Sequence, residues 1–334
     1  MTSKVLITDY VWPSVEPERT VLSKIGVELI IAPDGNEETL VKMVENVNGI
    51  LTCFAKVTPN VIKAAKKCAV IGRFGVGVDN ISVETATELG IAVTYVPDYC
   101  MDEVAEHVLA MLLAWNRRIV MFDNSVKTDG WGSLPLSMRI MRLSGKKLGI
   151  IGFGRIGNAV ATRAAALGME ILAFDPYLTA DVATEQGVGM VSLTTLLEES
   201  DFVTLHAPLT TNTENLIGKD QLNMMKKDAF LINAARGGLI DENALYDALI
   251  TGKIAGAGLD VMVEPSPSIS HPLLGLNNVI VTPHTAFFSQ ESVLELEVRA
   301  AEEVARVLTG TMPQNLVNME VLTHPNPRHS LRPR

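Results

Sequence analysis

The chain has 334 residues, of which 47% are hydrophobic and 20% are charged, and its formal net charge at pH 7 is -10. These values are typical of a globular protein with two domains and a large core. The negative charge argues against nucleic acid or an anionic membrane as the main partner, although local charge could still bind a small anionic substrate.

Short β-branched runs alternate with helix-like segments over the first hundred residues, which predicts a parallel sheet with crossover helices. The expected strands are Val5–Thr8, Val27–Ile31, Gly49–Leu51, Val70–Phe74 and Ala92–Thr94, and the expected helices cover residues 16–25, 37–46, 59–67 and 82–89. One long amphipathic helix is expected next, from Asp102 to Lys127, because acidic residues occupy its first turn.

A second alternating series begins at Lys147. Its six expected strands are Leu148–Ile151, Glu170–Phe174, Phe202–Leu205, Ala229–Ile232, Gly256–Asp260 and Val279–Thr282. Six strands complete a doubly wound sheet, so the helix expected at Ser289–Leu308 should pack on the first series instead. The tail after Asn318 contains Pro325, Pro327 and Pro333 and is expected to be loosely ordered.

This order of elements predicts an α/β protein with one domain inserted into another. We expect a Rossmann-type domain with a doubly wound parallel sheet at residues 101–286, inserted into a catalytic domain made of residues 1–100 and 287–334. Segment 129–145, DGWGSLPLSMRIMRLSG, is too apolar for a solvated loop. It is either a linker packed on its own chain or a dimerisation arm that covers a second subunit.

A glycine motif opens the second series. Gly152, Gly154 and Gly157 form G-x-G-x-x-G between an apolar strand and a helix-like stretch. These glycines would allow a tight turn, the approach of backbone to a pyrophosphate, and close packing of helix on strand. The helix N-terminus, with Ile156, would present N–H groups to the phosphates. Arg155 either contacts a phosphate or is a solvated helix residue.

The next strand, EILAFD, ends at Asp175. A carboxylate at this position would bind both hydroxyls of the adenosine ribose and repel a 2′-phosphate, so NAD is favoured over NADP. The alternative is that Asp175 is only a cap or turn residue before Pro176.

Polar residues follow the remaining strands at the edge where such a sheet binds its ligand. From the segments LHAPLT, NAARGG, GLDVMVEP and VTPHTAF we expect the cofactor-binding residues His206, Pro208, Ala234, Ala235, Asp260 and His284, and Thr213, three residues after LHAPLT, is expected to join them. The same edge should carry Arg236 and Glu264. A lone histidine is usually structural, and His107 and His271 are interpreted in that way.

These residue types suit hydride transfer to a carbonyl carbon. The carbonyl oxygen gains negative charge in that reaction, and His284 is placed to give it a proton. The Arg236 guanidinium cannot deprotonate and could bind a substrate carboxylate through two hydrogen bonds, while Gly237 and Gly238 leave space beside it. The alternative is an Arg236 paired with Asp260 or Glu264 for structure only.

The ordered motifs resemble the D-isomer-specific 2-hydroxyacid dehydrogenases over about residues 45–318. The motifs that carry the resemblance are GRFGVGVDNI (72–81), VAEHVLAMLLA (104–114), GIIGFGRIG (149–157), LHAPLT, LINAARGGLIDENAL (231–245), GAGLDV (256–261) and VIVTPHTA (279–286). Their spacing is similar to that of the bacterial branch closest to the C-terminal-binding proteins.

The resemblance implies an NAD domain inserted into a flavodoxin-like catalytic domain, acting as a homodimer on a 2-oxo acid or (R)-2-hydroxy acid. It implies that Arg236 orients the substrate, that His284 is the proton donor, and that backbone N–H groups of Val76 and Gly77 hold the carboxylate. A glutamate should partner the histidine five residues after the Asp of LDV. Here Pro265 stands at that position, and Glu264 comes one residue early. We expect a reshaped loop that still brings Glu264 to His284 as a catalytic residue, because Pro265 and Pro267 enforce an unusual local path; the alternative is a His284 without its usual partner.

The side-chain pocket is expected in the loop TCFAKVT (52–58), with Phe54 and Lys56 as substrate-binding residues. Tyr99, Met101 and Trp131 are weaker candidates.

The leading interpretation is an NAD-dependent dehydrogenase. Alternatives on the same fold are an NAD-sensing corepressor or scaffold, and a formate- or phosphite-type enzyme. The three cysteines, Cys53, Cys68 and Cys100, have no metal spacing, and MTSKVLITDY lacks the layout of a signal peptide, so a cytoplasmic protein without metal or membrane span is expected.

Overall fold

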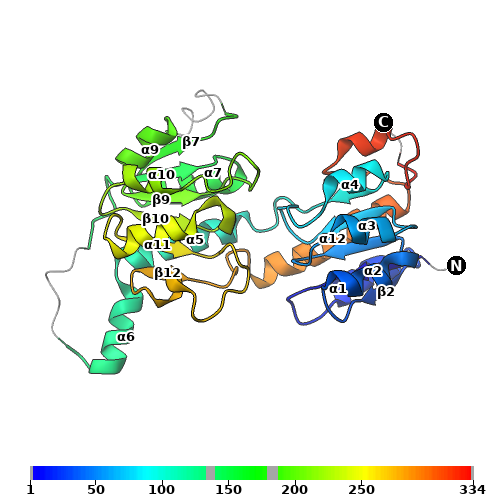
Figure 1. The fold of residues 1–334 in the computed structure, drawn as a ribbon, viewed down its shortest axis with the longest axis horizontal. Helices are drawn as coiled ribbons and strands as arrows, with labels where there is room; N and C mark the ends of the chain where they lie inside the picture. Colours follow the sequence, from blue (N-terminus) through cyan, green and yellow to red (C-terminus); the bar gives the residue numbers. More distant parts are fainter. Residues whose placement is uncertain (1–2, 133–139, 179–186, 332–334) are drawn as a thin grey trace. The chain divides into compact units, whose positions relative to one another are not determined.

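The computed structural model describes residues 3–132, 140–178 and 187–331. The chain forms two compact units, one from Met1–Tyr99 with Ser289–Arg334 and the other from Cys100–Phe288 (Figure 1). Each unit is an α/β domain with its own parallel sheet, so the predicted α/β fold with a Rossmann-type domain is confirmed. No helix in the described ranges is both long and apolar enough to cross a membrane.

The first unit contains five parallel strands among its described residues, in the order β2-β1-β3-β4-β5 (Figure 1). The strands are β1 (Lys4–Ile7), β2 (Glu28–Ile31), β3 (Gly49–Thr52), β4 (Val70–Arg73) and β5 (Ala92–Thr94). This order is that of flavodoxin-like sheets. The helices of the unit are α1 (Glu16–Ser23), α2 (Glu37–Met43), α3 (Pro59–Ala64), α4 (Val83–Glu88) and α12 (Gln290–Leu308), with short 3-10 helices at Val44–Asn46 and Met319–Thr323.

Helix α12 returns from the second unit and packs on the first sheet through glycines in the strands. A Cβ added at Gly72 in β4 would lie 2.6 Å from the Val304 side chain, and one added at Gly49 in β3 would lie 3.3 Å from the same valine. These contacts require glycine, because any larger residue would push the helix off the sheet. The chain therefore completes the first domain only with its last long helix.

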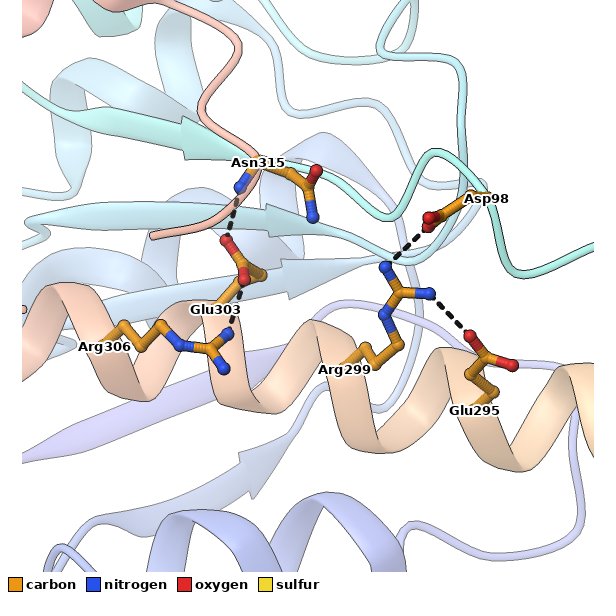
Figure 2. Close-up of polar contacts among 6 residues, drawn as sticks. All are labelled: Asp98, Glu295, Arg299, Glu303, Arg306 and Asn315. Carbon is orange, nitrogen blue, oxygen red and sulfur yellow. Dashed lines mark hydrogen bonds and ion pairs between the residues drawn. The ribbon is translucent and has the colours of Figure 1, made fainter. Parts of the chain in front are cut away.

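Arg299 and Glu303 of α12 bind neighbouring parts of the chain to this helix (Figure 2). Arg299 lies 2.5 Å from Asp98 and 2.5 Å from Glu295. Glu303 accepts a hydrogen bond from Arg306 at 2.6 Å and another from the Asn315 backbone N–H at 3.0 Å. Charge-assisted bonds of this kind are stronger than neutral ones, so the segments before the inserted unit and after α12 are both fixed to the first domain.

The described part of the C-terminal tail, up to Leu331, is held by contacts with the first domain, which corrects the expectation of a loosely ordered segment for these residues. The Asn318 side chain accepts a hydrogen bond from Val93 N at 2.8 Å and donates to Ile91 O at 2.9 Å, so it continues the edge of β5. Farther on, Arg328 donates to Ala65 O at 2.7 Å, and Leu331 is buried. These contacts hold the tail in spite of its prolines.

A pair of buried carboxyl groups joins α1 to α12. Glu18 and Glu297 are 0% and 6% exposed, and the Trp12 indole N–H donates to Glu18 Oε1 at 3.2 Å. Burial and the neighbouring Glu18 carboxyl raise the pKa of Glu297 to about 8, and burial also raises the pKa of Glu18. A protonated Glu297 would donate to Glu18, whose buried Oε2 has no other donor among the described residues.

We expect Glu297→Gln to stabilise the protein at alkaline pH. The folded state holds this proton more tightly than the unfolded state does, so the contribution of Glu297 to stability is full below about pH 4.5 and is lost as pH rises through about 8. Glutamine keeps the donor without the titration. Above pH 8, the Tm of the variant should exceed that of wild type by about 2–4 °C for each kcal/mol gained in the free energy of unfolding. The gain in Tm should vanish near pH 5. Thermal unfolding across this range checks it, with Glu291→Gln on the same helix as control. A gain of equal size at both pH values would contradict the shared proton.

The second unit contains seven parallel strands among its described residues, in the order β12-β11-β10-β9-β6-β7-β8 (Figure 1). The strands are β6 (Lys147–Ile151), β7 (Glu170–Phe174), β8 (Gly189–Met190), β9 (Phe202–Leu205), β10 (Phe230–Asn233), β11 (Gly256–Leu259) and β12 (Val279–Val281). The prediction of six strands missed β8, because two residues are too few to form a pattern. The helices are α5 (Met101–Asn116), α6 (Ile119–Asp129), α7 (Arg155–Ala166), α9 (Leu193–Glu199), α10 (Lys219–Met224) and α11 (Glu242–Ile250), with 3-10 helices at Gly237–Leu239 and Pro272–Gly275.

The single helix expected from Asp102 to Lys127 is wrong, since the chain breaks between α5 and α6. Arg118 has a left-handed backbone with φ of 56°, which an arginine rarely adopts. Its guanidinium lies 3.8 Å from the Trp115 ring centroid, and this cation–π contact offsets part of the cost. Helix α6 buries none of its residues, and Trp131 after it is 93% exposed.

The middle of the apolar segment 129–145 lies outside the described residues, which omit 133–139. Its far end is attached to its own unit. Met141 donates to the Asn116 side chain at 3.2 Å and accepts from it at 2.9 Å, and Met141 and Leu143 pack against the core of the second sheet.

Candidate active site

The second sheet reverses its strand order between β6 and β9, which is where doubly wound sheets bind ligands. Gly152, directly after β6, has a φ of +89°. A Cβ at this residue would lie 2.7 Å from Ala207 N and 2.7 Å from the carbonyl carbon of His206. Only glycine permits both this conformation and this approach of the loop after β9.

The start of α7 suits a pyrophosphate. A Cβ at Gly157 would lie 2.3 Å from Gly152 O, so this glycine lets the helix pack against the turn. A Cβ at Gly154 would meet nothing within 4 Å, so the backbone here faces open space. Arg155 and Ile156 form the first turn of α7, whose N–H groups have no intrahelical acceptor. This helix start could accept the phosphates of a dinucleotide, and the contact of Arg155 and Ile156 with them stays a prediction.

Asp175 follows β7 beside the glycine turn. Its Oδ2 accepts from Phe153 N at 3.0 Å, and its Oδ1 accepts from Tyr177 N at 2.9 Å. Each oxygen keeps further acceptor capacity, so the carboxylate can both shape the turn and accept ribose hydroxyls. The two interpretations of Asp175 are thus compatible.

We expect Asp175→Ala to weaken NAD binding and to narrow the preference for NAD over NADP by about tenfold or more, since hydrogen bonds to a charge and the repulsion of a 2′-phosphate are both lost. Asp175→Asn is the matched variant, because it keeps an acceptor and removes only the charge. Binding of NADH and NADPH, titrated by fluorescence, checks it. An unchanged ratio in both variants would assign Asp175 a purely structural role.

The loop after β9 is held by its own hydrogen bonds and carries a neutral histidine. Burial lowers the pKa of His206 to about 4, and its Nε2 lies 3.0 Å from Thr204 Oγ1. Farther along, Thr213 Oγ1 donates to Pro208 O at 2.6 Å and accepts from Thr210 N at 2.8 Å, which closes a turn. At neutral pH, His206 therefore offers a hydrogen bond and no charge to a ligand.

Arg236 leaves β10 through a turn closed by Asn233. The Asn233 side chain accepts from Ala235 N at 3.0 Å and donates to Arg236 O at 2.8 Å, while Arg236 Nη1 donates to Ala235 O at 2.7 Å. Ala234 and Ala235 are half-buried in this turn, as is Arg236. Sequence reasoning did not single out Asn233, although it fixes the backbone on which the arginine is mounted.

Gly237 has a different role from the one expected. It does not leave space beside Arg236, because an added Cβ would lie 2.0 Å from the backbone of Met262 and 2.4 Å from Val263 N. The turn that carries Arg236 therefore packs directly on the loop that leads to Glu264. Gly238 is also close to a neighbour, with Leu209 at 3.1 Å from its added Cβ.

Asp260 is buried and organises the loop that bears His284. Its carboxylate accepts from Thr282 Oγ1 at 2.6 Å, Thr285 N at 2.8 Å and Ala286 N at 2.9 Å, and its carbonyl accepts from His284 N at 2.8 Å. His284 has a left-handed φ of 55°, so these bonds hold the histidine in an uncommon conformation. Such strain is typical of functional positions.

His107 in α5 belongs to the same network, although the sequence suggested only a structural histidine. Its Nε2 lies 2.9 Å from Thr282 Oγ1 and 3.6 Å from Asp260 Oδ1. No spacing in the sequence connects α5 with β11 and β12, so this contact could not have been found without the fold.

Glu264 lies in an exposed loop, and among the described residues it makes no hydrogen bond or ion pair. The loop itself is held by Glu242, which accepts from Val263 N at 2.7 Å and lies 3.4 Å from His271 Nε2. The structure thus leaves the Glu264 carboxylate available, and its partnership with His284 stays a prediction.

The four expected substrate-binding residues lie in the first unit, after β3 and β4. Phe54 and Val76 are 38% and 37% exposed, and Lys56 is exposed as well. Within the described residues, the N–H groups of Val76 and Gly77 have no hydrogen-bond acceptor, as expected of amides that bind an anion. Of the weaker candidates, Tyr99 is buried, Met101 begins α5, and Trp131 is exposed.

A glycine turn at the switch point, an open helix N-terminus and an acid after the second strand define a dinucleotide-binding protein of the Rossmann type. The family description "D-isomer specific 2-hydroxyacid dehydrogenase, NAD binding domain" matches residues 109–286. The chain belongs to the D-isomer specific 2-hydroxyacid dehydrogenase family, and NAD is the cofactor of its Rossmann domain.

Among the relatives, a D-3-phosphoglycerate dehydrogenase of Methanocaldococcus jannaschii is 43% identical over 95% of this chain. The chain spans only 59% of the length of that protein. A glyoxylate reductase of Korarchaeum cryptofilum is 40% identical and covers 86% of this chain and 87% of its own length. The solved structure of the TT0316 protein from Thermus thermophilus has 34% identity and a TM-score of 0.85, and it covers 94% of this chain and 99% of its own.

Proposed function

We propose that this protein is an NAD-dependent oxidoreductase that interconverts a 2-oxo acid and its (R)-2-hydroxy acid. The observation that carries the proposal is the placement of Arg236 and His284 at the same sheet edge as the dinucleotide turn. A cation that binds carboxylate and a titratable acid beside a hydride carrier are the groups that carbonyl reduction needs. The names of the relatives, which are dehydrogenases and reductases of 2-hydroxy and 2-oxo acids, support the same chemistry.

Each group has a distinct role in the proposed reduction. When bound, NADH supplies the hydride that reduces the carbonyl carbon. Arg236 binds the carboxylate and the carbonyl oxygen and orients them, while His284 gives its proton to that oxygen as charge develops on it. Glu264 stabilises the protonated histidine. In oxidation, His284 takes the hydroxyl proton instead.

Residues of the first domain complete the substrate site in this proposal. The N–H groups of Val76 and Gly77 bind the carboxylate, and their lack of acceptors within the described residues supports this role. Phe54 and Lys56 face the substituent on C3 of the substrate. Lys56 would favour a second anionic group, whereas the alternative is a solvated loop lysine.

We further propose a homodimer assembled through α6 and the segment 129–145. Helix α6 buries none of its side chains, and Ile119 and Val120 are 55% and 50% exposed. An apolar helix surface of this kind is typical of an interface.

The placement near the C-terminal-binding-protein branch rests on motif spacing alone, and no observation favours the corepressor alternative.

A cytoplasmic location is also part of the proposal. Cys53, Cys68 and Cys100 are buried and form no disulfide, and burial raises the pKa values of Cys53 and Cys68 to about 12. Buried thiols that form no disulfide are typical of proteins in a reducing compartment.

Oxidation of NADH with a panel of 2-oxo acids tests the proposed activity. The panel includes glyoxylate, pyruvate, hydroxypyruvate and the 2-oxo form of 3-phosphoglycerate. We expect turnover with at least one of them, and an (R)-configured product by chiral chromatography for every member except glyoxylate, whose product is achiral. Tight NADH binding without turnover on any member would contradict the proposal and favour the corepressor alternative.

A further inference from the structure

The loop after β3, which carries Phe54 and Lys56, is held by a single carboxylate through three successive N–H groups. Asp9 Oδ1 accepts from Cys53 N at 3.0 Å, and Asp9 Oδ2 accepts from Phe54 N at 2.6 Å and Ala55 N at 3.0 Å. Hydrogen bonds to an ionised acceptor are among the stronger ones in proteins. The three N–H groups therefore converge as they would on a bound anion, and here the anion is the Asp9 carboxylate.

The carbonyl side of the same turn is held from the opposite direction. The Asn80 side chain donates through Nδ2 to Cys53 O at 3.2 Å and to Ala55 O at 2.9 Å, and Thr52 Oγ1 donates to Ala55 O at 3.0 Å. Asn80 ends the FGVGVDN segment after β4, which contains Val76 and Gly77. Asp9 follows β1, so side chains from two neighbouring loops fix the backbone of the third.

The two side chains cannot exchange roles. Three N–H groups point at position 9, so an amide there would direct its own N–H₂ at donors. Two carbonyl oxygens point at position 80, so a carboxylate there would face acceptors. Phe54 and Lys56 are exposed. The backbone that carries these two side chains is held by its hydrogen bonds to Asp9 and Asn80.

We propose that Asp9 and Asn80 are positioning residues that determine how large a substituent on C3 of the substrate the site accepts. They fix the loop bearing Phe54 and Lys56 at a constant distance from the amides of Val76 and Gly77. The inference rests on the proposed function, in which those amides bind the carboxylate and the loop faces the C3 substituent. A loosened loop leaves hydride and proton transfer intact but no longer fits a larger substituent.

The test compares the smallest and the largest 2-oxo acid that the wild-type protein reduces. In Asp9→Asn and in Asn80→Asp, KM for the larger acid should rise about tenfold, as expected for the loss of a hydrogen bond to a charge or the creation of a repulsive one. KM for the smallest acid, KM for NADH and kcat for the smallest acid should stay within about twofold. Asp34→Asn is the matched control, because Asp34 also follows a strand of this sheet and accepts from Asn36 N at 2.9 Å.

An equal rise in KM for both acids would show that Asp9 and Asn80 only stabilise the fold. An unchanged KM for both acids would show that the position of the loop depends on neither residue. Either result overturns the inference. If a variant does not fold, as judged by its Tm and NADH binding, the milder Asn80→Ala decides by the same comparison. A wild-type protein that reduces no 2-oxo acid refutes the proposed function itself, which is a separate outcome.

Discussion

His284→Gln is expected to lose nearly all turnover in both directions, by about 100- to 10,000-fold in kcat, which is the usual contribution of a positioned acid or base. Glutamine can still donate a hydrogen bond but cannot give or take a proton. The bonds of the histidine backbone to Asp260 should keep the loop in place, because they do not involve the side chain. Steady-state kinetics in both directions, with NADH binding measured separately, check the result.

The control for His284 is His324→Gln, the same change at a histidine of the C-terminal tail, where Nε2 lies 3.1 Å from Glu88 O. It should keep its activity. A His284→Gln variant with more than about one tenth of the wild-type kcat would remove the histidine from the mechanism, because even a modest acid–base contribution is larger than tenfold.

Glu264→Gln separates the role of the acid from that of the histidine. Reduction needs protonated His284, so its rate should fall as pH rises. If Glu264 stabilises the imidazolium, removal of its charge should move this fall to lower pH, and the acid limb of the oxidation profile should move in the same direction. Unmoved pH–rate profiles would mean that Glu264 is not the partner, in keeping with its exposed loop.

Arg236→Lys is expected to lower kcat/KM for the 2-oxo acid by about 100-fold or more while NAD binding is retained. Lysine keeps the positive charge but loses the planar pair of donors that orients a carboxylate. Small errors of orientation at a reacting centre cost roughly this factor. Transient and steady-state kinetics on the variant and the wild type distinguish poor binding from slow chemistry.

Arg163→Lys is the matched control for this change, since Arg163 in α7 bonds Asp102 at 2.5 Å. It should have wild-type kinetics. Near-wild-type kcat/KM in Arg236→Lys would instead favour an arginine that only closes the turn after β10, where its Nη1 already donates to Ala235 O.

Much of the fold could be predicted because parallel strands are buried on both faces. Every residue of β3, β4, β9, β10 and β11 is buried, so each strand stands out as an apolar run between polar segments. The predicted strands agree with the observed ones within one residue at each end, apart from β8. The glycine motif was equally local, because its three positions lie within six residues of chain.

Breaks in regular structure were not predictable, because each depends on a contact that compensates for a poor local conformation. The left-handed Arg118 is tolerated with its guanidinium over Trp115. The tail is ordered because the Asn318 side chain bonds the edge of β5. Sequence patterns report average preferences, and neither contact changes the local pattern.

By itself, the sequence determined the two parallel sheets and the position of the NAD turn, since these depend on burial and on glycine, and it predicted from residue type which side chains are chemically active. Only the tertiary structure decided how those side chains are held. Asp260 orders the loop of His284, Gly237 packs on the loop of Glu264, and Asp9 and Asn80 clamp the loop of Phe54. These contacts join residues far apart in the chain, and hydrogen-bond geometry and close packing between loops exist only once the strands have been brought side by side.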